Sequence, residues 1–150
     1  MNEREHSGMK AERSILVVDD NERLVGLIER LLESAGYRVS TAHDGLTGLD
    51  KAREERPDLI ILDIVMPGEI NGYQACYHLH TDRRTKDIPV LILTGKWENA
   101  EESKRELNRR ITEQVGAYDL GAMDYMTKPV RGRELLSRIR GLLWFSGGDR

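Results

Sequence analysis

The sequence has little of what disulfide-linked, membrane-spanning and nucleic-acid-binding proteins usually need. Its one cysteine, Cys76, excludes a disulfide within the chain and fits a reducing compartment, so we expect a cytoplasmic location. No apolar run approaches the roughly 20 residues of a membrane helix, and we expect no membrane partner. The net charge of -3, from 23 basic and 26 acidic residues, argues against direct binding to nucleic acid, which requires a basic excess.

Short apolar runs alternate with helical patterns along most of the chain. Strands are predicted at residues 15–18, 38–42, 59–62, 90–93 and 123–127. Several of these runs are apolar at consecutive positions, which is typical of parallel strands covered by helices on both faces. Between and after them, hydrophobic residues recur at helical spacing around 24–35, 46–52, 73–80, 107–118 and 135–143.

Helix boundaries and fold class follow from the same pattern. Asn21 or Asp20 can cap the first helix, Gly36 can end it, and Pro57 closes the second. Five strand–helix repeats predict a doubly wound α/β fold. We expect a single domain at residues 14–145, with flexible tails at 1–13 and 146–150.

Polar residues stand at the ends of four predicted strands: Asp19, Asp20, Asp63, Thr94 and Lys128. The carboxyl ends of parallel strands meet at one edge of the sheet, where ligands bind, so these side chains are expected to converge. Three carboxylates in one place repel each other unless a cation joins them. Oxygen ligands of this kind suit Mg²⁺.

A carboxylate-held cation beside a lysine and a threonine is suited to phosphoryl chemistry. The cation and the ammonium would neutralise phosphate oxygens, and the threonine hydroxyl would donate a hydrogen bond. Because no Ser or Cys lies at the centre, the candidate nucleophile is a carboxylate that would form an acyl phosphate. Asp63 is the best candidate because it ends the middle strand.

Four motifs resemble the receiver domain of bacterial response regulators, and they occur in the family's order over nearly the whole chain. They are Ile-Leu-Val-Val-Asp19-Asp20, Leu-Ile-Ile-Leu-Asp63-Ile-Val-Met66-Pro67-Gly68, Leu-Ile-Leu-Thr94-Gly95 and Asp-Tyr125-Met-Thr-Lys128-Pro129. The resemblance implies a flavodoxin-like receiver fold with a five-stranded parallel sheet in the order 2-1-3-4-5. It also implies a phospho-switch that is not a conventional enzyme.

The resemblance implies a role for each acidic residue. Asp63 would accept a phosphoryl group from a histidine kinase or a phosphotransfer protein. Asp20 and Asp63 would bind Mg²⁺ directly, Asp19 would bind it through water, and the backbone carbonyl of Val65 would be a further ligand. The switch would act on a downstream protein or output domain, and a homodimer is compatible with the family.

Further roles are implied around the phosphoryl group. Lys128 would contact it, Thr94 would move toward it, and Tyr125 would change rotamer in response. Gly95 would leave the phosphate reachable, and Pro129 would follow a cis peptide bond, as in relatives.

The sequence departs from the family pattern in two places. The loop between Pro67 and Gly72 has one residue more than usual. Lys128 follows Thr94 by 34 positions (94 to 128), about three helical turns more than usual. The additional segment, about 96–113, is mostly charged or polar, and we expect a lengthened, solvated fourth helix.

Two other functions are weighed against the receiver. A phosphohydrolase of the haloacid dehalogenase type also uses a nucleophilic Asp, but it needs a second Asp two positions later, where this chain has Val65. A flavodoxin-like electron carrier needs a phosphate-binding loop after the first strand. Asp19 and Asp20 stand there, and their charges would repel a phosphate.

Overall fold

The computed structural model describes residues 12–66, 68–95, 105, 109, 113 and 123–146. The strands are β1 (Ser14–Val18), β2 (Arg38–Ala42), β3 (Leu59–Asp63), β4 (Val90–Thr94) and β5 (Met123–Thr127). They form one sheet in the order β2-β1-β3-β4-β5, and every neighbouring pair is parallel. The predicted fold class and strand order are confirmed.

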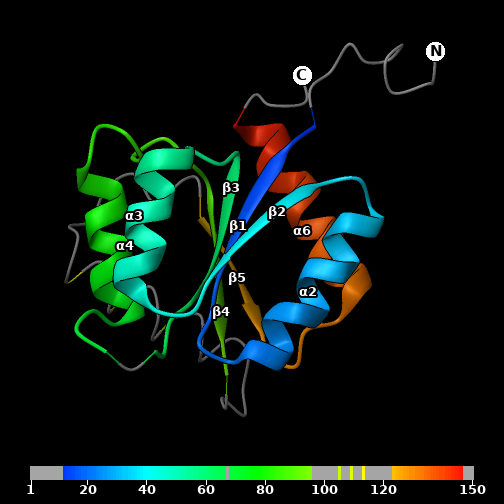
Figure 1. Cartoon of the computed structure of the whole chain (residues 1–150), viewed down its shortest axis with the longest axis horizontal. Coiled ribbons are helices and arrows are strands. Elements are labelled where there is room, and N and C mark those ends of the chain that lie inside the picture. Colours follow the sequence, from blue (N-terminus) through cyan, green and yellow to red (C-terminus); the bar gives the residue numbers. More distant parts are fainter. Residues whose placement is uncertain are drawn as a thin grey trace.

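Helices cover both faces of this sheet (Figure 1). On one face lie α3 (Gly45–Glu55) and α4 (Gly72–Thr81), and on the other lie α2 (Glu22–Ser34) and α6 (Gly132–Phe145). Alternate strand residues face opposite layers: Leu16 and Val18 pack toward α3 and α4, whereas Ile15 and Val17 pack toward α2 and α6. The central strands β1, β3 and β4 are therefore apolar on both faces, as their sequences predicted.

The helix ends follow the predicted signals. The side chain of Asn21, and not that of Asp20, caps α2 by accepting a hydrogen bond from Leu24 N at 3.1 Å. Gly36 follows α2 with a φ of 96°, in the left-handed region that glycine tolerates. Helix α3 ends at Glu55, with Arg56 as its C-cap residue immediately before Pro57.

Several sequence-based predictions lie largely outside the described residues. Arg105, Arg109 and Glu113 are helical, and Arg109 Nη1 lies 2.7 Å from Glu113 Oε1. The rest of the predicted helix at 107–118 and of the lengthened segment at 96–113 is outside the described part, as are nearly all residues of the two predicted tails. Within the described part, no helix has the length and apolar character needed to cross a bilayer.

Candidate functional site

The residues predicted to converge lie at one edge of the sheet. Asp19 follows β1, Asp63 ends β3, Thr94 ends β4 and Lys128 follows β5, and these strands are neighbours in the sheet. Two backbone hydrogen bonds continue the ladder past the strand ends. Asp19 N donates to Ala42 O at 3.1 Å, and Lys128 N donates to Thr94 O at 2.6 Å. Backbone hydrogen bonds to the neighbouring strand ends thus anchor Asp19 and Lys128 at this edge.

Side-chain alternation sorts these residues onto the two faces of the sheet. The odd-numbered residues of β1 and β3 pack toward α2 and α6, so Asp19 and Asp63 continue that side. In β4 the even-numbered residues pack toward α3 and α4, so Thr94 belongs to the opposite side. Tyr125, half-buried on β5, packs against the same α3/α4 cluster.

Three carboxylates crowd this edge of the sheet. Asp19, Asp20 and Asp63 each offer an oxygen, and these oxygens lie within 4.8 Å of one another. Asp19 and Asp63 are buried, whereas Asp20 is exposed. Lys128 Nζ lies 3.1 Å from Asp19 Oδ2 and 3.5 Å from Asp63 Oδ2. One ammonium beside three carboxylates leaves the cluster with excess negative charge.

This crowding changes the proton affinity of Asp63. Burial is the largest cause, and together with the charge of Asp19 it raises the pKa of Asp63 to about 6. The positive charge of Lys128 and a hydrogen bond from Val65 N to Asp63 Oδ1, at 3.3 Å, act in the opposite direction. At neutral pH the Asp63 carboxylate is mostly ionised, although the fold disfavours its charge.

The donor set fits a hard divalent cation. Asp19 Oδ1 accepts a hydrogen bond from Asn21 N at 2.9 Å. Asp19 Oδ2 is buried and accepts no hydrogen bond from the described part of the chain, and its nearest positive charge is the ammonium of Lys128 at 3.1 Å. A buried carboxylate oxygen without a hydrogen-bond donor, next to two further carboxylates, is suited to Mg²⁺ with its preference for oxygen ligands.

The edge opens into a hollow of about 400 Å³ lined by Asp20, Asn21, Asp63, Val65, Gly95 and Lys128. The Val65 side chain is 69% exposed beside it. A Cβ atom on Gly95 would lie 3.5 Å from Cδ of Lys128, which is ordinary van der Waals contact and places Gly95 directly beside the lysine. The Lys128–Pro129 peptide bond is cis, as predicted.

Two residues that are not among the predicted site residues also shape this edge. His43 Nδ1 lies 3.3 Å from Asp19 O, and the rule that strand ends meet could have found it, because β2 ends one residue earlier. Gly72 N donates to Ile64 O at 3.2 Å. A Cβ on Gly72 would lie 2.4 Å from Ile64 Cα and 2.6 Å from Asp63 O, so only glycine lets α4 begin this close to the phosphoacceptor candidate.

The chain is similar in sequence to a known protein family and to several curated proteins. The model of the family described as response regulator receiver domain matches residues 15–140. The chain is 40% identical to RpaA of Synechocystis, described as a DNA-binding dual master transcriptional regulator, over 86% of this chain and 48% of RpaA. It is 39% identical to protein PilH of Pseudomonas aeruginosa, over 86% of this chain and 96% of PilH.

Solved structures similar to this chain belong to the same kind of protein. The chemotaxis protein CheY4 of Vibrio cholerae superposes with a TM-score of 0.71 at 28% identity, over 89% of this chain and 100% of that one. A CheY-like receiver domain protein of Methanospirillum hungatei gives a TM-score of 0.72 at 26% identity, over 93% and 100%. The chain spans about half the length of curated regulators such as RpaA (48%), and nearly all of PilH (96%). The chain therefore belongs to the response regulator receiver domain family of two-component signalling, whose members are switches and not conventional enzymes.

Proposed function

We propose that Asp63 is the phosphoacceptor of this receiver domain and that its donor is a histidine kinase or a phosphotransfer protein. One observation carries the proposal: Asp63 ends the central strand, and its carboxylate lies within a cluster of three aspartates with Lys128 Nζ 3.5 Å away. The raised pKa of about 6 still leaves Asp63 mostly ionised at neutral pH, as a nucleophile requires.

The proposed transfer step moves the phosphoryl group from a donor histidine to Asp63. A carboxylate oxygen of Asp63 forms the new O–P bond, the P–N bond of the donor phosphohistidine breaks, and the leaving imidazole nitrogen keeps the electron pair. Lys128 contacts a phosphoryl oxygen and offsets its negative charge. Thr94 supplies a hydroxyl donor from the neighbouring strand end.

Mg²⁺ is the cofactor that the acidic cluster supports. We assign Asp20, Asp63 and the Val65 backbone carbonyl as direct ligands and Asp19 as a ligand through water. Asp20 is exposed and accessible to an ion from solvent, whereas Asp19 Oδ1 already accepts a hydrogen bond from Asn21 N, and this supports the division. When bound, the ion neutralises charge on the carboxylates and on the phosphoryl oxygens.

The switch is proposed to act through the α3/α4 side of the sheet. Thr94 and Tyr125 both belong to that side, so movement of the threonine toward a phosphoryl group frees space next to the tyrosine. Gly95 keeps the phosphoryl group reachable, and Pro129 fixes the backbone after Lys128. A change of Tyr125 rotamer then alters the surface that a downstream protein or output domain reads.

We place the receiver domain at residues 14–145 of a cytoplasmic protein. Its partners are proteins, and a homodimer is compatible with the family. RpaA is described as DNA-binding, and this chain matches only 48% of it, so we propose no direct contact of the receiver domain with nucleic acid or membrane. A haloacid dehalogenase type of hydrolase is disfavoured because Val65 stands where that chemistry needs an acidic residue.

The test uses a small phosphodonor, acetyl phosphate, with Mg²⁺ and intact-mass spectrometry. We expect one acid-stable, base-labile phosphoryl group on the parent protein and none on Asp63→Asn. Asp87→Asn, a matched change at an exposed position before β4, should be labelled like the parent. A phosphoryl group that persists on the Asp63 variant would disprove the assignment.

A further inference from the structure

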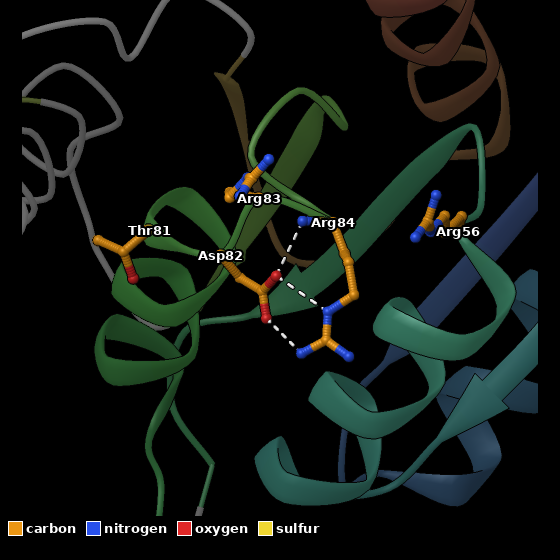
Figure 2. A pocket seen from close by; sticks show the side chains of 5 residues that line it. All are labelled: Arg56, Thr81, Asp82, Arg83 and Arg84. Atoms are coloured by element: carbon orange, nitrogen blue, oxygen red, sulfur yellow. Dashed lines mark hydrogen bonds and ion pairs between the residues drawn. The ribbon is translucent and has the colours of Figure 1, made fainter.

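A second polar hollow lies where α3 and α4 end, away from the acidic cluster. Figure 2 shows the side chains that line it, namely Arg56, Thr81, Asp82, Arg83 and Arg84. Its volume is about 610 Å³, and it is open to solvent. Three of the five lining side chains are arginines, which is a marked local basic excess in a chain whose net charge is -3.

Among the described residues that line this hollow, Asp82 is the only carboxylate, and both of its oxygens are already bound by arginines. Arg84 holds both oxygens of Asp82, with Nη2 at 2.9 Å from Oδ2 and Nε at 3.1 Å from Oδ1 (Figure 2). Arg53 Nε lies 2.9 Å from Oδ2 as well. These bonds, chiefly the side-chain hydrogen bond from Arg84, hold the pKa of Asp82 well below its usual range. Asp82 therefore stays ionised and saturated, with little capacity for further cations.

Arg56 and Arg83 keep their guanidinium donors available. Both are exposed, and neither side chain makes a hydrogen bond or ion pair with any residue that the structure describes. Arg56 also has a φ of 46°, in the left-handed region that glycine occupies with less strain. The negative end of the helix dipole favours cations near a helix C-terminus, which explains why arginines are tolerated here. This long-range attraction does not occupy the N–H donors of the guanidinium groups.

We propose that this hollow docks an acidic segment of a partner protein, with its carboxylates bound by Arg56 and Arg83. Guanidinium groups bind carboxylates with two parallel hydrogen bonds, and arginine is enriched in protein interfaces. Tyr77, 41% exposed, lies one helical turn before the lining residue Thr81, whose hydroxyl donates to Tyr77 O at 3.0 Å, so α4 presents an exposed aromatic side chain next to a residue of the hollow. A small molecule is a poorer occupant, because sites for small ligands bury most of the ligand surface.

The proposed docking surface is separate from the phosphoacceptor edge. Arg56 precedes β3 and Asp63 ends it, and the five residues of this strand span roughly 13 Å. A segment bound at the arginines would leave the acidic cluster open to a phosphodonor. The inference thus does not depend on Asp63 being phosphorylated.

The test is fluorescence anisotropy with fluorescein-labelled peptides of equal length that carry zero, three or six glutamates, at physiological salt and without Mg²⁺. We expect the parent protein to bind more tightly as the glutamate number rises. The double variant Arg56→Gly/Arg83→Ala should weaken binding of the hexaglutamate peptide by about tenfold or more. Glycine suits the backbone at position 56, so this variant should fold, and its melting curve will verify that.

A matched control removes two exposed arginines elsewhere, Arg133→Ala/Arg140→Ala on α6. It should change the affinity by less than about twofold, as expected for charges remote from the site. Asp63→Asn should bind the peptide like the parent, which separates this proposal from the phosphoacceptor assignment. No binding by the parent, equal weakening in both double variants, or displacement of the peptide by an equal charge of inorganic pyrophosphate would each overturn the proposal.

Discussion

Two aspartates of this chain lie in opposite electrostatic environments: Asp63 at the carboxyl end of β3, and Asp82 in the loop that follows α4. Asp63 is buried beside the Asp19 carboxylate, and its pKa is raised to about 6. Asp82 is surrounded by the guanidinium groups of Arg53 and Arg84, and its pKa is lowered. At one end carboxylates outnumber cations, and at the other end cations outnumber carboxylates.

The difference separates a reactive carboxylate from a structural one. Asp82 organises the loop after α4: its Oδ1 accepts a hydrogen bond from Arg84 N at 2.8 Å, and its carbonyl accepts one from Thr85 N at 3.0 Å. Asp63 accepts one long hydrogen bond, from Val65 N at 3.3 Å, among the residues described. The fold thus leaves Asp63 under-stabilised, and a metal ion or a phosphoryl group can change its free energy strongly.

The largest expected effect on stability comes from Gly72→Ala, which probes the close packing of the backbone next to Asp63. In Gly72→Ala the new Cβ would meet backbone atoms of Ile64 and Asp63 at 2.4 to 2.6 Å, and backbone cannot yield as a flexible side chain can. We expect a loss of about 3 kcal/mol or more in the free energy of unfolding. Urea titration gives the value.

Gly141→Ala is the matched control for that substitution. A Cβ at Gly141 would meet nothing within 4 Å, and the residue lies within α6, so alanine should stabilise the protein by about 0.5 to 1 kcal/mol. Equal effects of the two substitutions would show that the acidic edge is not built on tight backbone packing.

The next effect concerns the unfavourable charge of Asp63 itself. Because its pKa rises from an ordinary value near 4 to about 6 on folding, the group's contribution to stability is present below about pH 4 and is lost as the pH rises through 6. Asp63→Asn should therefore stabilise the metal-free protein at pH 7 by up to about 3 kcal/mol. At pH 4 the gain should largely vanish.

Thermal melts in EDTA across pH 4 to 8 measure this effect. Asp50→Asn, at an exposed position on α3, should show no comparable change with pH. A stabilisation by Asp63→Asn that is the same at pH 4 and pH 7 would contradict the electrostatic explanation.

The third effect is stabilisation of the folded protein by Mg²⁺ binding at the three aspartates. We expect no such stabilisation from the arginine-lined hollow at the ends of α3 and α4. A ligand that binds only the folded state at 100 times its dissociation constant stabilises it by about 2.7 kcal/mol. Asp20→Ala should lose most of this gain, and without metal it should melt at or above the parent temperature, because it removes like-charge repulsion. Asp50→Ala should respond to Mg²⁺ like the parent. Undiminished Mg²⁺ stabilisation of the Asp20 variant would show that the ligand assignment is wrong.

The fold and the position of the acidic edge could be predicted from sequence because both depend on local patterns. Runs such as Leu-Ile-Ile-Leu at 59–62 are apolar at consecutive positions and too short for a helix, which is typical of a strand covered on both faces, and Leu59–Asp63 is indeed buried at every position. Once the strands are parallel, their carboxyl ends must meet, and this brings Asp19, Asp63 and Lys128 together whatever the exact packing.

Features that depend on tertiary packing could not be predicted. Asp19 and Asp20 are adjacent in sequence, yet only the finished packing decides that Asp19 is completely buried and Asp20 exposed. The close approach of Gly72 to Ile64 is equally invisible in the sequence. Arg53 reaches Asp82 across 29 positions, and nothing in either segment alone indicates that contact.

The smallest expected effect on stability concerns Asp82, in the loop after α4. Asp82→Asn replaces the carboxylate by a neutral amide and weakens its bonds to Arg53 and Arg84, so stability at pH 7 should fall. The fall should be smaller than each effect above, since the Arg84 side chain is 52% exposed and solvent screens the pair.

The dependence of this effect on pH should be the reverse of that for Asp63. The folded-state pKa of Asp82 is lowered, so the contribution of Asp82 to stability is present above about pH 4 and is lost as the pH falls through the folded-state pKa. The melting temperatures of the parent and the variant should therefore keep a constant separation above about pH 5 and begin to converge only as the pH falls below about 4, while Asp87→Asn follows the parent throughout. If the two melting temperatures instead moved further apart as the pH is lowered, the stability contribution of Asp82 would have the same pH dependence as that of Asp63. The proposed electrostatic contrast between the two aspartates would then be wrong.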